Sequence, residues 1–203
     1  MTLRTLAVAF LVTMFSSNPS NAYLGVFDEP RIAFGRPTLP PLGHTGFCLK
    51  YRSDCLVQGR HAADAQTTDL IEINSAINKE IKPKRQFLDG EHWLLSPETG
   101  DCNDYAVTKR HELIESGLPS RALRLSVVKT ASGAGHLVLV VMTTRGDLVM
   151  DNLTQAIRPW RSTGYQWLKI QSATDAKFWY EVRPPASGPS ISQVDQKLRL
   201  ADR

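Results

Sequence analysis

The hydrophobic period of this chain changes once, from helical to strand-like, and this change limits the fold more than any other feature. Between residues 68 and 116 apolar side chains recur at the spacing of amphipathic helices. Beyond residue 121 the chain is rich in β-branched, aromatic and alternating residues. Helices followed by strands predict an α+β domain, in which the helices pack on an antiparallel sheet.

Two helices are predicted. The first spans about residues 68–81 and ends before Pro83, and the second starts at Asp101 and is closed by Gly117. The second helix therefore begins beside Cys102.

Five strands follow, and the turn at residues 144–147 joins the second and third as a hairpin. The predicted strands cover residues 122–129, 136–143, 147–152, 165–172 and 177–182. By contrast, residues 23 to about 59 carry many prolines and glycines and predict an irregular wrap. We expect the part of the second helix that contains Lys109, Arg110 and His111 to be exposed.

The first 22 residues have the pattern of a secretory signal peptide. Arg4 precedes a ten-residue, mainly apolar run, and the small-residue pattern Ser20-Asn21-Ala22 follows. This run is shorter than the roughly 20 residues that span a bilayer, and no later segment approaches that length. We therefore expect an exported, periplasmic protein without a transmembrane segment in its mature chain. An uncleaved membrane anchor is the alternative.

The chain length then fits one domain, over residues 23–183, with a flexible tail over residues 184–203. The net charge of +4 is spread along the chain, without the runs of Lys and Arg that are typical of nucleic-acid binders. Nothing in the sequence therefore suggests DNA or RNA as a partner.

Export changes the interpretation of the three cysteines, because disulfides persist in oxidising compartments. Cys48 and Cys55 lie seven positions apart, and a bridge between them would contribute about 2.5 kcal/mol in the chain-entropy model. Two free buried thiols are the alternative. Cys102 remains as an odd cysteine, which implies either intermolecular pairing or a reactive group.

A nucleophilic site can be built from Cys102, His136 and Asp151. A thiol attacks as the thiolate, which a helix N-terminus and an imidazole both favour. His136 and Asp151 lie on the two arms of the predicted hairpin, where the carboxylate can orient the imidazole. A backbone amide near Cys102 can serve as an oxyanion donor. Each residue also has an ordinary structural role open to it: a buried cysteine, a turn histidine and a strand-end aspartate.

Four segments resemble the bacterial transglutaminase-like cysteine proteinases, the family that contains the periplasmic LapG-type adhesin-releasing proteases. The segments are Gly100-Asp101-Cys102-Asn103-Asp104-Tyr105-Ala106-Val107, Ala122 to Val128, Gly135-His136-Leu137-Val138-Leu139 and Leu148-Val149-Met150-Asp151-Asn152-Leu153. The resemblance implies a papain-like α+β core with Cys102 as nucleophile, His136 as base and Asp151 as the residue that orients it. It also implies that Trp93 lies near the active site, although core packing explains this tryptophan equally well.

Asp101 and Asp104 flank the cysteine, and their charges would disfavour a thiolate. They could cap the helix by accepting hydrogen bonds from its free amides. Alternatively, they could bind Ca²⁺, whose charge would reverse the local field. The resemblance implies calcium at these two positions, and both interpretations stay open at this point.

The residues and the resemblance together predict a thiol endopeptidase. The resemblance implies that its substrate is the periplasmic part of a large surface adhesin, so that cleavage affects biofilm attachment, and that an inner-membrane receptor restrains such enzymes. Two alternatives remain: a transglutaminase, in which an amine captures the same acyl-enzyme, and a non-catalytic module that binds calcium or a partner.

Overall fold

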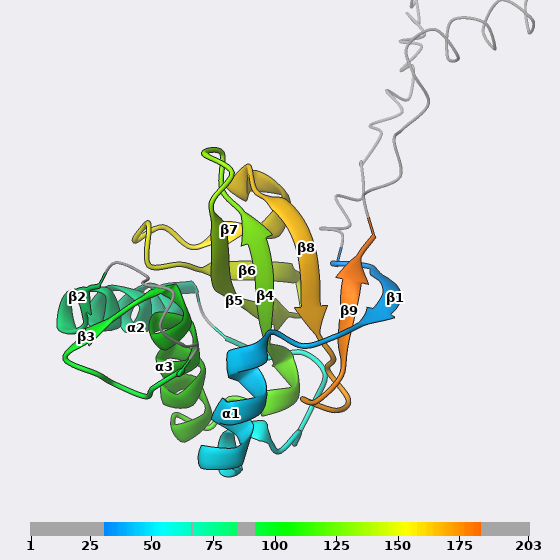
Figure 1. The fold of residues 1–203 in the computed structure, drawn as a ribbon, viewed down its shortest axis with the longest axis horizontal. Coiled ribbons are helices and arrows are strands. Elements are labelled where there is room, and N and C mark those ends of the chain that lie inside the picture. The colour runs from blue at the N-terminus through cyan, green and yellow to red at the C-terminus, as the bar shows by residue number, and fades with distance from the viewer. Residues whose placement is uncertain (1–30, 66, 85–91, 184–203) are drawn as a thin grey trace, which may run out of the picture.

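The computed structural model describes residues 31–65, 67–84 and 92–183 (Figure 1). The predicted signal peptide and the predicted C-terminal tail both lie outside these residues. None of the helices that the structure describes has the length and apolar character needed to cross a bilayer.

The described helices are α1 Leu42–Lys50, α2 Thr67–Glu80 and α3 Cys102–Glu115, with 3₁₀ turns at Ser53–Cys55, Ser120–Ala122 and Trp160–Thr163. The strands are β1 Phe34–Thr38, β2 Lys82–Pro83, β3 Thr99–Gly100, β4 Leu123–Lys129, β5 Gly135–Thr143, β6 Gly146–Met150, β7 Arg158–Pro159, β8 Gln166–Gln171 and β9 Trp179–Val182. The long strands of the sheet follow the last helix, as predicted, but the short strand β1 precedes the described helices and β2 and β3 lie between α2 and α3.

Seven strands form one sheet in the order β1-β9-β8-β4-β5-β6-β7, and every neighbouring pair is antiparallel. In Figure 1 the helices gather at one side of this sheet, and α3 packs against β5 and β4. The short strands β2 and β3 form a separate parallel pair. The α+β class predicted from the sequence is confirmed.

Two clusters of the core lie on opposite faces of the sheet, and a third, small cluster joins Ile77, Ile81 and Tyr105. Along β5, Leu137, Leu139 and Val141 belong to the cluster that includes the helices, whereas Val138 and Val140 belong to a second cluster with Trp160. This alternation follows from the period of two in a strand. β5 is therefore apolar on both faces from Leu137 to Val141, directly after His136.

The prediction of an irregular segment up to residue 59 was wrong, because this segment contains β1 and α1. β1 includes Pro37, which an edge strand tolerates because one side of its backbone needs no partner in the sheet. α1 contains Gly43 and Gly46, each of which costs about 1 kcal/mol in a helix interior. Burial of Phe47 and the disulfide at Cys48 offset that cost. Tertiary contacts, rather than local preference, make this helix.

The prediction that α3 is exposed around His111 is also wrong. Lys109 and Arg110 are buried, and Arg110 donates hydrogen bonds to the carbonyl oxygens of Asp54 and Leu123. The turn at Ser53–Cys55 and the strand β4 cover this side of the helix, which its sequence alone does not reveal.

Candidate active site

Cys102 is the first residue of α3, as the sequence predicts. Asp101 caps the helix by accepting a hydrogen bond from the backbone N–H of Asn103 at 2.8 Å, and Asp104 accepts one from the N–H of Asp101 at 3.0 Å. This reciprocal pair is a capping box, which fixes where the helix begins. Gly100 is required beside it, because a Cβ at this position would lie 2.8 Å from the Asp104 side chain.

The β5–β6 hairpin brings His136 and Asp151 together. His136 is the second residue of β5, and Asp151 directly follows β6. The His136 Nε2 lies 2.8 Å from Asp151 Oδ1, and both side chains are buried, with 5% and 3% of their surfaces exposed. This bond leaves Nδ1 as the ring nitrogen that can exchange a proton with the thiol.

Cys102 and His136 line one open cleft of about 240 Å³, together with Trp93. The thiol is half-buried, so that a reagent or a substrate can reach it. The structure therefore brings the three predicted catalytic residues and the predicted cleft residue to one place.

The charges of its neighbours keep the His136 ring protonated. Burial alone would lower the pKa of His136, but the hydrogen bond to Asp151, the neighbouring Cys102 sulfur and the negative charge of Asp151 raise this pKa to about 9. Burial alone would likewise raise the pKa of Asp151, but the bond and the charge of His136 hold it below its usual value. The pair is thus an imidazolium and a carboxylate at neutral pH.

Tyr165 is a site residue that the sequence did not indicate. Its hydroxyl donates a hydrogen bond to Asp151 Oδ2, and its ring meets the His136 ring edge-on, with centroids 5.9 Å apart. The N–H of Leu153 donates to Oδ1 at 2.9 Å. Tyr165 directly precedes β8 and lies 14 positions after Asp151 in the chain. The two residues meet because of how the sheet packs, so no local motif could have identified Tyr165 as a site residue.

Trp93 forms part of the cleft wall and is otherwise buried, with 3% of its surface exposed. The ring of His44, from α1, packs edge-on against it at a centroid distance of 5.7 Å. The indole Nε1 is buried and has no hydrogen-bond partner among the described residues. Trp93 therefore serves both predicted purposes, core packing and the lining of the cleft.

The acidic pair beside Cys102 forms a complete helix cap, and its carboxylate oxygens are of the ligand type that calcium prefers. Asp104 uses both of its oxygens, because Oδ1 also accepts from the N–H of Leu94 at 2.8 Å. A carboxylate oxygen that accepts one N–H keeps a second lone pair, and Asp101 bonds through Oδ1 alone. Calcium takes six to eight oxygens, so backbone carbonyls and water would have to complete its shell.

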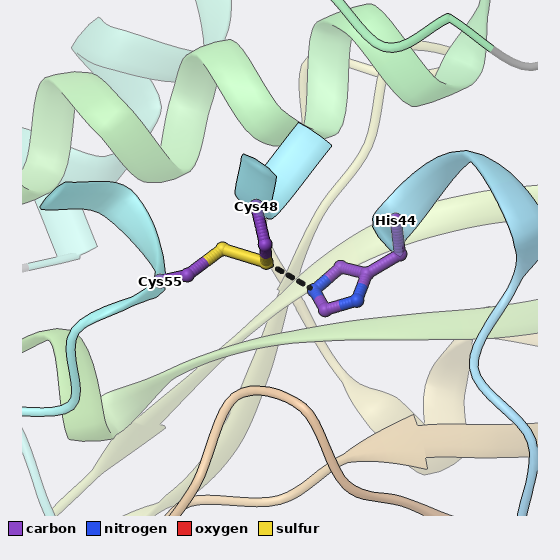
Figure 2. A group of neighbouring side chains, drawn as sticks. All are labelled: His44, Cys48 and Cys55. Atoms are coloured by element: carbon purple, nitrogen blue, oxygen red, sulfur yellow. Dashed lines mark hydrogen bonds between the residues drawn. A yellow bond between two sulfur atoms is a disulfide. The ribbon is translucent and has the colours of Figure 1, made fainter. Parts of the chain in front are cut away.

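Within the described part of the chain, one group of at least three His, Cys, Asp or Glu side chains has metal-binding spacing: His44, Cys48 and Cys55 (Figure 2). The structure joins the two cysteines in a disulfide, so that their sulfurs are not thiolate ligands. Burial, and then the charge of Arg110, lower the pKa of His44 to about 4, and this ring is therefore neutral. This group connects α1 to the turn that follows it.

This chain is similar to known proteins in sequence and in fold. Residues 34–187 match the family model of the bacterial transglutaminase-like cysteine proteinases. Calcium-bound LapG of Legionella pneumophila is similar in fold, with a TM-score of 0.51 and 20% identity over 66% of this chain and 79% of that one. The EGTA-treated form has a TM-score of 0.50 and 18% identity over 68% and 80% of the two chains.

No match was found among curated proteins. The family model covers most of the chain, including the helix of Cys102 and the hairpin of His136 and Asp151. The chain therefore belongs to the bacterial transglutaminase-like cysteine proteinases and is a cysteine protease.

Proposed function

We propose that this protein is an endopeptidase that uses Cys102 as nucleophile, His136 as acid and base, and Asp151 to orient the imidazole. One observation carries the proposal: Cys102 and His136 line the same open cleft, and the His136 ring is hydrogen-bonded to the buried Asp151. A structural cysteine needs neither an imidazolium partner nor access to solvent.

Acylation starts when the Cys102 sulfur attacks the carbonyl carbon of the scissile peptide bond. Negative charge then develops on the carbonyl oxygen, where the N-terminus of α3 provides backbone N–H groups and the positive end of its dipole. His136 donates its proton to the leaving amine, the C–N bond breaks, and a thioester forms. Asp151 compensates the charge of the imidazolium throughout this step.

Deacylation reverses these roles. His136, now neutral, accepts a proton from water, and the resulting hydroxide attacks the thioester carbon. The sulfur leaves, the carboxylic acid product forms, and the thiolate–imidazolium pair is restored.

Alkylation of Cys102 tests the site directly. At pH 6.5 we expect iodoacetamide to modify Cys102 at least about tenfold faster in the wild type than in His136→Gln, because the imidazolium stabilises the attacking thiolate. Peptide mapping identifies the modified residue, and quenched time points give the rate. Equal rates in the two proteins would show that His136 does not activate this thiol, and the proposal would fail.

We also propose that the protein acts in the periplasm on the periplasm-facing part of a large surface adhesin, and so affects biofilm attachment. The predicted signal peptide and the Cys48–Cys55 disulfide support an oxidising compartment. The family match supports a protein substrate, and the resemblance to LapG-type proteases supports an adhesin. That resemblance also supports restraint by an inner-membrane receptor.

For calcium, we propose that Asp101 and Asp104 hold one ion beside the catalytic thiol. Similar structures include a calcium-bound LapG and an EGTA-treated LapG, and the oxygen donors of this chain suit the ion. A bound Ca²⁺ would neutralise the two carboxylate charges next to Cys102.

Calorimetric titration of the EGTA-stripped protein checks this proposal. We expect one Ca²⁺ site in the wild type and binding at least about tenfold weaker in Asp101→Asn, which keeps the N-cap but removes its charge. Glu98→Gln, which removes a carboxylate from an exposed ion pair with Lys82, is the matched control and should bind as the wild type does. Absence of binding, or equal binding in Asp101→Asn, would remove the site.

A further inference from the structure

The catalytic cleft adjoins a second, larger hollow. Pro41 lines the cleft, whereas Pro40 lines a hollow of about 480 Å³, twice the volume of the cleft. Consecutive Cα atoms lie about 3.8 Å apart, so the two hollows are lined by directly neighbouring residues of the chain. A polypeptide that crosses this wall can occupy both.

The wall of this second hollow is largely apolar. Leu49, Leu56 and the Cys48–Cys55 disulfide line it, and the two leucines are 70% and 55% exposed. Leu39 and Leu42, on either side of the two prolines, are each 81% exposed. Large apolar side chains gathered at the surface in this way are typical of binding sites.

The charge at this hollow has one sign. Arg52 and Lys177 line it and are exposed, His44 is neutral, and none of the described residues that line it is acidic. A symmetric dimer through this face would bring the same basic side chains of two copies together, which like charges oppose. An acidic segment of another polypeptide fits better.

We propose that this hollow, formed by Leu49, Leu56, Arg52 and Lys177, is a second substrate subsite. It takes an apolar side chain of the polypeptide being cut, and the two basic residues bind an acidic residue next to that side chain. Because the bound polypeptide is extended, with a rise of about 3.3 Å per residue, the bound side chain lies at a fixed number of residues from the scissile bond. This inference rests on the proposed function and adds the class of sequence that the enzyme selects.

The experiment compares the cleavage sites of the wild type and of the variants. The substrate is a library of tryptic peptides from a bacterial proteome, whose amines are blocked, and mass spectrometry identifies each new cleavage site. For the wild type we expect an apolar side chain and an adjacent Asp or Glu, each enriched at least about threefold at fixed positions relative to the cut. Leu49→Ser/Leu56→Ser should lose the apolar enrichment. Arg52→Glu/Lys177→Glu should lose the acidic one.

Matched controls on the exposed face of α2 are Ile71→Ser and Lys79→Glu, and both should keep the wild-type profile. Iodoacetamide should modify Cys102 at the wild-type rate in all variants. Identical cleavage profiles in all variants would overturn the subsite. Slower alkylation of Cys102 in the two double variants of the hollow would also overturn it, because it would show that the hollow only supports the structure of the cleft.

Two other outcomes are distinct. A wild-type protein that cuts none of the peptides, although its Cys102 is alkylated rapidly, would contradict the proposed endopeptidase itself and the subsite with it. A concentration-dependent dimer in sedimentation, abolished by Leu49→Ser/Leu56→Ser, would assign the hollow to a second copy and overturn the subsite alone.

Discussion

Cys102→Ala is expected to lower kcat/KM for peptide cleavage by at least about 10⁴-fold, because it removes the atom that bonds to the substrate. No other free cysteine is present among the described residues, since Cys48 and Cys55 form a disulfide. The measurement is cleavage of the peptide library and of a co-expressed N-terminal adhesin fragment.

Folding should be little affected by this change. The Cys102 side chain is only half-buried, and the helix cap is made by Asp101 and Asp104 rather than by the thiol. We therefore expect the melting temperature of Cys102→Ala to stay within about 2 °C of the wild type, because the change removes one half-buried sulfur and keeps the cap. A folded Cys102→Ala protein that cuts at more than one per cent of the wild-type rate would rule out Cys102 as the nucleophile.

The local parts of this site could be predicted from the sequence. Asp101 and Asp104 frame Cys102 with the spacing of a capping box, which identifies a helix start without any tertiary information. The turn at residues 144–147 likewise defines a hairpin, and a hairpin brings its arms together wherever it lies in the fold.

The parts that depend on distant packing could not be predicted. α1 is a poor helix by composition, and it forms because Phe47 and His44 bury against the core and Cys48 is bonded to Cys55. Tyr165 reaches Asp151 only because β7 and the following turn bring the chain back to this end of the sheet. These contacts decide where Pro41 lies at the cleft and how Asp151 is held.

Asp151→Asn is expected to lower kcat by about 10²–10⁴-fold, because an amide can hold the imidazole in the wrong tautomer and cannot stabilise its positive charge. Asp151 and Cys102 together raise the pKa of His136 to about 9. Protonated His136 serves the leaving amine, so wild-type kcat/KM should fall as the pH rises through about 9. Without the carboxylate the pKa of His136 falls, and the decline should begin at lower pH.

Tyr165→Phe separates this electrostatic role from mere support of the fold. It keeps the Asp151 charge and the bond to His136 but removes the hydrogen bond to Oδ2. Because this hydrogen bond exists in the ground state as well as in the transition state, only part of its contribution of about 1.5–3 kcal/mol should appear in kcat, as a decrease of at most roughly 150-fold. The carboxylate then interacts more strongly with the imidazolium, so the alkaline limit should not move to lower pH.

The two pH profiles together decide the role of the carboxylate. If Asp151→Asn loses activity but keeps an alkaline limit near 9, the charge of Asp151 does not govern His136, and its effect is structural. If Tyr165→Phe moves the limit downward as Asp151→Asn does, the tyrosine supports the imidazolium by another route than Asp151. Profiles that move for Asp151→Asn alone would establish that one buried carboxylate sets the pH range in which this protease works.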